Sequence, residues 1–152
     1  MRYIYILMPL LTLISCGGPK PFDISNPTQR YITFGNGGGF TGAVTTHHLL
    51  EDGRIFREVN ENETVEVGKI DGDLAKQQFN NYTLLNFQDV NINDPGNIYY
   101  FIKHSDFPEK RSITWGGNNT EVPSAISTFH LNLSKIVRSI NENSKPYKSA
   151  QK

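Results

Sequence analysis

Residues 31–70 read YITFGNGGGFTGAVTTHHLLEDGRIFREVNENETVEVGKI, and most of the predicted sheet comes from this stretch. Its β-branched and aromatic residues gather in four runs, which cover residues 31–34, 43–50, 54–59 and 64–70. Such runs predict strands, and the Glu-Asp-Gly triplet after the second run is a typical hairpin signal. Consecutive strands joined by short turns usually pair with one another. The stretch therefore predicts an antiparallel meander.

A short helix and two further strands are predicted after the meander. Asp71 is suited to cap a helix over residues 72–82. The apolar residues of this helix recur at helical spacing: Ala75, Phe79 and Tyr82. A turn signal at residues 94–96 then precedes residues 98–104 and 111–115, which are again rich in strand-forming types.

The final helix has the clearest pattern in the chain. Pro123 suits its first turn. Its stripe follows helical spacing through Ile126, Phe129, His130, Leu133, Val137 and Ile140. The order of elements is then β-β-β-β-α-β-β-α. Because amphipathic helices bury their stripes against a sheet, we predict an α+β fold, with an antiparallel sheet of about six strands and two helices packed on one face.

The N-terminus has the layout of a secretory signal. Residues 1–15, MRYIYILMPLLTLIS, place Arg2 before an apolar run of about a dozen residues. A helix needs about 20 apolar residues to span a bilayer. The run is therefore too short to span, and we expect it to be removed as a signal peptide during export.

Residues 13–16, Leu-Ile-Ser-Cys, resemble the lipobox of bacterial lipoprotein precursors. The resemblance implies cleavage between Ser15 and Cys16 and acylation of Cys16, the single cysteine of the chain. Each buried methylene of such a lipid contributes about 0.8 kcal/mol to membrane binding. Gly17 stands where an aspartate often retains lipoproteins at the inner membrane, so the expected location is the outer membrane of the cell envelope. The alternative is an ordinary cleaved signal with a chance cysteine.

The rest of the chain divides into three segments. Residues 16–29 are rich in proline and glycine, and predict a lipidated N-terminus with a flexible tether that could extend to roughly 40 Å. Residues 30–142 predict a single α+β domain, and residues 143–152 a disordered polar tail. The ordered segment, which opens with ITFGNGGGFTG, resembles uncharacterised small domains of Bacteroidota lipoproteins. Those domains have no assigned activity.

Charge is balanced in this chain. Lys and Arg number 15, as do Asp and Glu, and the loss of Arg2 with the signal leaves 14 against 15, a formal net charge of −1. A nucleic-acid partner requires clustered cations that neutralise phosphates. The expected partners are therefore the membrane, through the lipid anchor, and an envelope protein or glycan, with no nucleic acid.

The glycine run matches a nucleotide-loop pattern in spacing alone. Residues 37–44, GGGFTGAV, fit G-x-G-x-x-G-x-V, but the chain lacks the lysine, catalytic-loop and D-F-G motifs that accompany this loop in kinases. No nucleotide or other cofactor is expected. Glycine lets a ligand approach the backbone closely. A role at the rim of a binding site is therefore one hypothesis for Gly37, Gly38 and Gly39.

The histidines do not predict a metal site. His47 and His48 are adjacent on a predicted strand and should point to opposite faces. His130 lies in the apolar stripe of the final helix and has no ligand type three or four residues later. We interpret it as a core histidine with one hydrogen bond.

Strand alternation places three aromatic residues on one face of the sheet: Phe56, Tyr99 and Phe101. If both helices cover the opposite face, these rings form a strip that could stack on sugars or anchor a peptide. The alternative is that the tether or a loop covers them, or that the strand at 98–104 is buried on both sides.

No catalytic signature accompanies these features, and no catalytic residue is predicted. No G-x-S-x-G or S-x-x-K pattern presents a serine beside a histidine and an orienting acid. A pair of acids for glycoside cleavage would have no characteristic spacing in the sequence. The sequence therefore favours a lipid-anchored, non-catalytic binding or assembly module of the cell envelope. The alternatives are an envelope hydrolase, or a hydrolase inhibitor that presents its glycine loop.

Overall fold

The computed structural model describes residues 22–61, 63–103 and 112–143. The predicted signal, Cys16 and the C-terminal tail lie outside these residues. The described elements are β1 (Tyr31–Gly38), β2 (Val44–Leu50), β3 (Arg54–Asn60), β4 (Glu63–Lys69), α1 (Gly72–Leu84), a 3-10 turn η1 (Phe87–Asp89), β5 (Asn93–Asp94), β6 (Ile98–Lys103), β7 (Ser112–Trp115) and α2 (Ser124–Asn143).

The predicted meander is confirmed. Strands β1 to β4 pair antiparallel with their neighbours in the chain, and the described strands form one sheet in the order β4-β3-β2-β1-β6-β7-β5. Strand β1 runs further than predicted, because residues 35–38 of the glycine-rich segment pair with β6. The turn to β2 therefore contains only residues 39–43.

The sheet is mixed and has seven described strands, whereas we predicted an antiparallel sheet of about six. The additional strand, β5, has two residues and lies parallel to β7. Asp94 stabilises this edge, because its carboxylate accepts hydrogen bonds from the backbone N–H groups of Asn119 and Thr120, at 2.9 and 2.8 Å. A strand of two residues has no hydrophobic period, so the sequence could not reveal it.

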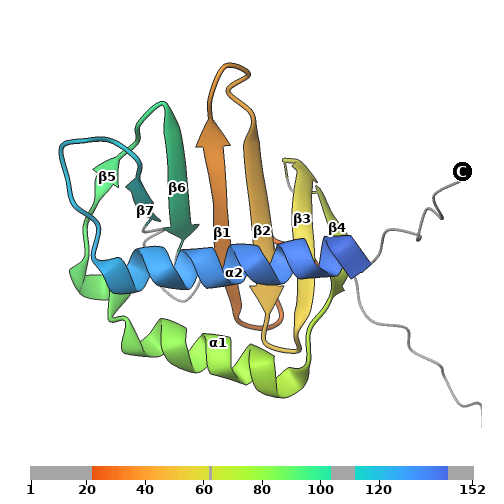
Figure 1. The fold of residues 1–152 in the computed structure, drawn as a ribbon. Helices are drawn as coiled ribbons and strands as arrows, with labels where there is room; N and C mark the ends of the chain where they lie inside the picture. The colour runs from red at the N-terminus through yellow and green to blue at the C-terminus, as the bar shows by residue number, and fades with distance from the viewer. Residues whose placement is uncertain (1–21, 62, 104–111, 144–152) are drawn as a thin grey trace, which may run out of the picture.

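Both helices pack against the same face of the sheet, which we call the inner face, as predicted. One hydrophobic core joins this face to both helices, and its fully buried members include Ile32, Leu49, Ile102, Ile113 and Leu133. In the view of Figure 1, α2 crosses in front of the lower part of the strands and α1 lies below it. The upper part of β1, β2 and β6 therefore projects beyond the helices.

A smaller core lies on the opposite face, which we call the outer face. Phe22 packs there with Leu50 and Phe56, and Ile24 and Tyr31 surround them. Phe22 and Ile24 fall within the predicted tether, so part of that segment rests on the domain. Neither helix of the described residues combines the length and the apolar character that crossing a membrane requires.

Candidate functional site

The three aromatic residues singled out from the sequence lie on the outer face. Tyr99 and Phe101 face the same way as Gly37 and Gly35, with which they pair, and their ring centroids are 6.4 Å apart. Phe101 and Phe56 are each only 4% exposed, whereas Tyr99 is half-buried. Phe56 lies beneath Phe22, with 5.3 Å between the ring centroids. For Phe56, this corresponds to the alternative in which the tether covers the ring.

The glycines of the nucleotide-like pattern have structural roles. The ring of Tyr99 lies where a side chain on Gly37 would stand, since its Cζ is 2.6 Å from the position of a Cβ there. Gly38 has a φ of +96° and lies against the Asn97 carbonyl. Gly39 has open space around it and donates its N–H to the same carbonyl at 2.7 Å. The next residue, Phe40, is fully exposed at the tip of the turn.

The histidines occupy three separate environments. His47 lines the inner face, stacked on Phe34 with 5.7 Å between ring centroids. His48 is completely buried on the outer face, as its pairing with Phe56 requires. His130 donates from Nε2 to the Gly35 carbonyl at 2.8 Å, which confirms a core histidine with one hydrogen bond. Within the described segments, no three His, Cys, Asp or Glu residues are grouped to hold a metal ion.

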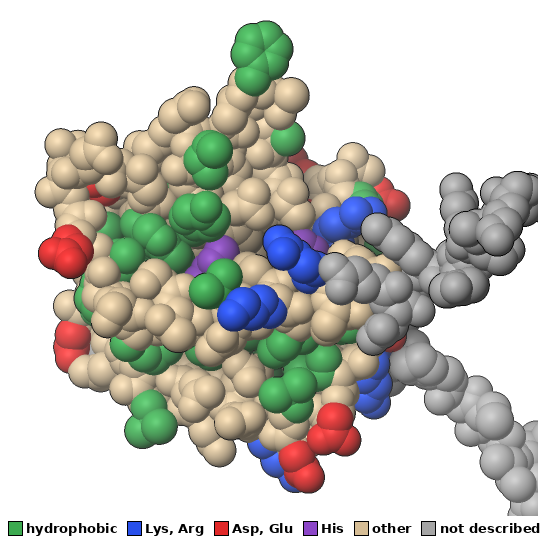
Figure 2. Space-filling model, in the orientation of Figure 1, with side chains coloured by type: hydrophobic (Ala, Val, Ile, Leu, Met, Phe, Trp, Pro, Cys, Tyr) green, Lys and Arg blue, Asp and Glu red, His purple; other side chains and the backbone are tan. Residues whose placement is uncertain are grey.

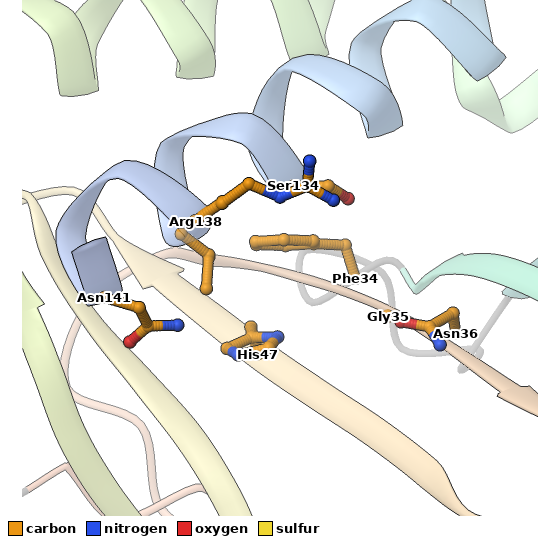
Figure 3. A pocket seen from close by; sticks show the side chains of 8 residues that line it. Phe34, Gly35, Asn36, His47, Ser134, Arg138 and Asn141 are labelled. Carbon is orange, nitrogen blue, oxygen red and sulfur yellow. The ribbon is translucent and has the colours of Figure 1, made fainter.

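The candidate site is a groove between α2 and the strands β1 and β2, on the part of the inner face that the helix leaves uncovered. Its volume is about 540 Å³, and we call it the α2 groove. It is lined by Phe34, Gly35, Asn36, His47, Ser134, Val137, Arg138 and Asn141. Figure 3 shows that Ser134, Arg138 and Asn141 come from the helix and that Phe34, Asn36 and His47 come from the strands.

The α2 groove is polar with a positive edge. Arg138 of α2 is exposed, and Arg57 of β3 stands beside His47, its partner in the sheet. Burial and the neighbouring Arg57 charge lower the pKa of His47 to about 4. At neutral pH the His47 ring is therefore uncharged, and the positive charge belongs to the arginines. Neither arginine has a partner among the ion pairs of the described residues.

Three exposed hydrophobic residues continue this surface beyond the groove. Tyr100 is opposite Asn36 in the sheet, and its exposed fraction is 40%. Ile98 is 54% exposed on the same face of β6, and Leu131 of α2 is 52% exposed. We call these residues the β6 shelf. Figure 2 shows hydrophobic side chains gathered above and on α2 in this view, with histidines recessed among them and lysine or arginine alongside.

The α2 groove could have been found in the sequence. Asn36 and His47 interrupt the inward-facing alternation of Ile32, Phe34 and Leu49 with polar groups. Ser134, Arg138 and Asn141 recur at i, i+4 and i+7, which makes a polar stripe beside the apolar one. The described lining has no carboxylate, and the Ser134 hydroxyl donates to the His130 carbonyl at 2.9 Å. The described lining thus offers hydrogen bonds and positive charge rather than a nucleophile with its base.

A scan against protein-family models finds no match to this chain, and neither does a search of curated proteins.

Proposed function

We propose that this chain is a lipid-anchored lipoprotein of the bacterial cell envelope, held on the outer membrane through Cys16. Its domain is a non-catalytic binding or assembly module that engages an envelope protein or glycan. The observation that carries the binding function is the uncovered part of the inner face, where the β6 shelf adjoins the α2 groove. Clustered apolar surface next to polar groups is typical of binding sites.

The aromatic and cationic residues of this surface are further support for a binding function. Tyr100 and Arg138 belong to the residue types that contribute most energy at interfaces. Tyr100 is held in place by its neighbours, because its ring lies 5.3 Å from the His130 ring and 5.9 Å from the Trp115 ring, centroid to centroid. An exposed aromatic ring in a fixed position loses little conformational entropy when it binds.

A second function, inhibition of a hydrolase, is favoured by one observation. Phe40 is fully exposed at the tip of a turn whose ends are fixed by strand pairing and by the Gly38 hydrogen bond to the Ala43 carbonyl, at 3.2 Å. A large apolar side chain on such a turn is suited to enter a pocket of another protein. An envelope hydrolase with another site is the remaining alternative, and cleavage of a glycan or ester by the purified protein would support it.

The anchor is tested by labelling producing cells with a palmitate analogue. The wild-type chain should incorporate the label and partition into the membrane, whereas Cys16→Ser should lose all labelling because the only thiol is gone. The matched control is Ser25→Ala, which leaves Cys16 and the signal intact. Equal labelling of wild type and Cys16→Ser would contradict the anchor.

The binding face is tested by photo-crosslinking in the producing cells. A photoreactive amino acid at position 100 should give a crosslinked species that the same group at Leu84 does not give. Leu84 is an exposed hydrophobic residue at the C-terminal end of α1, outside the α2 groove and the β6 shelf. A crosslink confined to position 40 would favour the inhibitor instead. Identical crosslinking at positions 100 and 84, or none at either, would contradict binding through this face.

A further inference from the structure

We propose that the α2 groove binds an acidic saccharide, with Arg138 holding a sugar carboxylate and Tyr100 stacking on a sugar ring beside it. This inference rests on the proposed binding function, and it specifies the ligand class and the residues that select it.

Charge complementarity favours an anionic ligand. The groove contains the exposed side chain of Arg138, and Arg57 of β3 is paired in the sheet with His47, which lines the groove. Glu58, next to Arg57 in the chain, points to the outer face, where its Oε2 lies 3.8 Å from Nε2 of His48. The described carboxylates therefore leave the charge of the groove uncompensated. A guanidinium pairs well with a carboxylate, which it contacts through two parallel N–H groups.

The neutral lining favours hydroxyl groups as the remainder of the ligand. Asn36 and Asn141 contribute amides and His47 an imidazole. Burial and Arg57 hold the pKa of His47 at about 4, so its ring carries both a donor and an acceptor at neutral pH. Amides and a neutral imidazole also donate and accept, as sugar hydroxyls do. The partly exposed ring of Tyr100, paired with Asn36 in the sheet, provides an apolar surface for the sugar ring.

The position of the groove argues against a peptide. Peptides commonly bind by adding a strand to a free sheet edge or by laying a helix in an apolar groove. Strands β1 and β2 both lie inside the sheet, where each pairs on its two sides. The strand residues that line the groove, residues 34–36 and 47, are therefore paired on both sides. The polar lining also does not suit an amphipathic helix.

The test titrates the full protein, purified in detergent with the N-terminus that the producing cell leaves, with three probes. These are trigalacturonic acid, the neutral maltotriose and triglutamate. Affinity is measured by calorimetry and by the fluorescence of Trp115, the only tryptophan, whose ring lies 5.9 Å from that of Tyr100. Trigalacturonic acid should bind about tenfold more tightly than maltotriose, because a hydrogen bond to a charged group is lost with the carboxylate.

Two variants locate the site. Arg138→Gln should weaken trigalacturonic acid binding by about tenfold or more while its urea midpoint stays unchanged, since Arg138 is exposed. Lys135→Gln removes the same charge from the same helix but does not line the groove, so it should weaken binding by less than about twofold.

Three outcomes would overturn the inference. The first is that trigalacturonic acid shows no saturable binding. The second is that triglutamate binds as tightly as trigalacturonic acid. The third is that Arg138→Gln and Lys135→Gln weaken the binding of trigalacturonic acid equally, which would indicate unspecific attraction between charges. If any of these occurs while the crosslink at position 100 persists, the binding function stands and the acidic saccharide is excluded. Loss of that crosslink as well would exclude both.

Discussion

Replacing Gly35 by alanine should lower the free energy of unfolding by about 3 kcal/mol, because it forces a methyl group into a closed space. A Cβ at this position would overlap the Thr45 carbonyl oxygen of β2 and would stand 2.6 Å from Cζ of Phe101. The carbonyl belongs to the backbone of a central strand and cannot move without disturbing the sheet. Gly35 also accepts the His130 hydrogen bond, so any shift of its backbone would reach α2.

Urea unfolding followed by Trp115 fluorescence measures this change. The matched control is Gly39→Ala, at a position with a φ of +74° and no atom within 4 Å of the added Cβ. It should cost only about 1 kcal/mol, the penalty of a left-handed backbone for a residue with a side chain. If the two alanine variants lost the same stability, close packing at Gly35 would be the wrong explanation.

The domain should also lose stability as the pH falls from about 6.5 to about 4. His48 has no exposed surface, and burial, with smaller contributions from Lys103 and His47, lowers its pKa to about 4. Its Nδ1 is 2.9 Å from the Thr33 hydroxyl, whereas its buried Nε2 has no hydrogen-bond partner among the described residues. The Glu58 carboxylate favours the charged ring, but it is 3.8 Å away and partly exposed, so burial outweighs it.

The sign of this pH dependence follows from the depressed pKa. In the unfolded chain a histidine takes up a proton near pH 6.5, whereas folded His48 resists protonation until about pH 4. The unfolded state therefore binds more protons in this interval, and the stability that is complete above pH 6.5 is lost on acidification. The contribution of His48 is about 3 kcal/mol. His47 and His130, whose pKa values are also lowered by burial, act in the same direction.

Unfolding by urea at a series of pH values tests this directly. His48→Gln should flatten the slope of the unfolding free energy between pH 6.5 and 4, even though the variant is less stable at neutral pH. His47→Gln should flatten it less, because His47 is only half-buried. An unchanged slope in His48→Gln would show that this ring is not the group that titrates.

Much of the fold could be predicted because its elements have local signals. The meander follows from β-branched runs and short turns, and α2 follows from a stripe that extends from Ile126 to Ile140. Strand β5 could not be predicted, since it is formed by the parallel pairing of two residues with β7. The lipobox assignment stays a prediction, because Cys16 lies outside the described residues.

The proposed binding face was harder to predict, because it depends on which part of the sheet the helices leave uncovered. Strand alternation correctly placed Tyr99 and Phe101 on the face of the sheet opposite to that of Tyr100. The sequence does not show that Phe22 packs on Phe56. It also does not show how far across the sheet α2 reaches. Because the helix leaves the upper part of the inner face open (Figure 1), the exposed ring is Tyr100 rather than Phe56.

The position of Phe22 limits how far the domain could lie from the lipid that we propose on Cys16. Phe22 is only 8% exposed, and its carbonyl accepts a hydrogen bond from the Thr64 hydroxyl of β4 at 3.1 Å. Five residues separate Cys16 from Phe22, and the six Cα-to-Cα steps between them span at most about 20 Å. The outer face around Phe22 would then lie close to the bilayer, and the uncovered part of the inner face, on the other side of the sheet, would be turned toward the molecules beyond it.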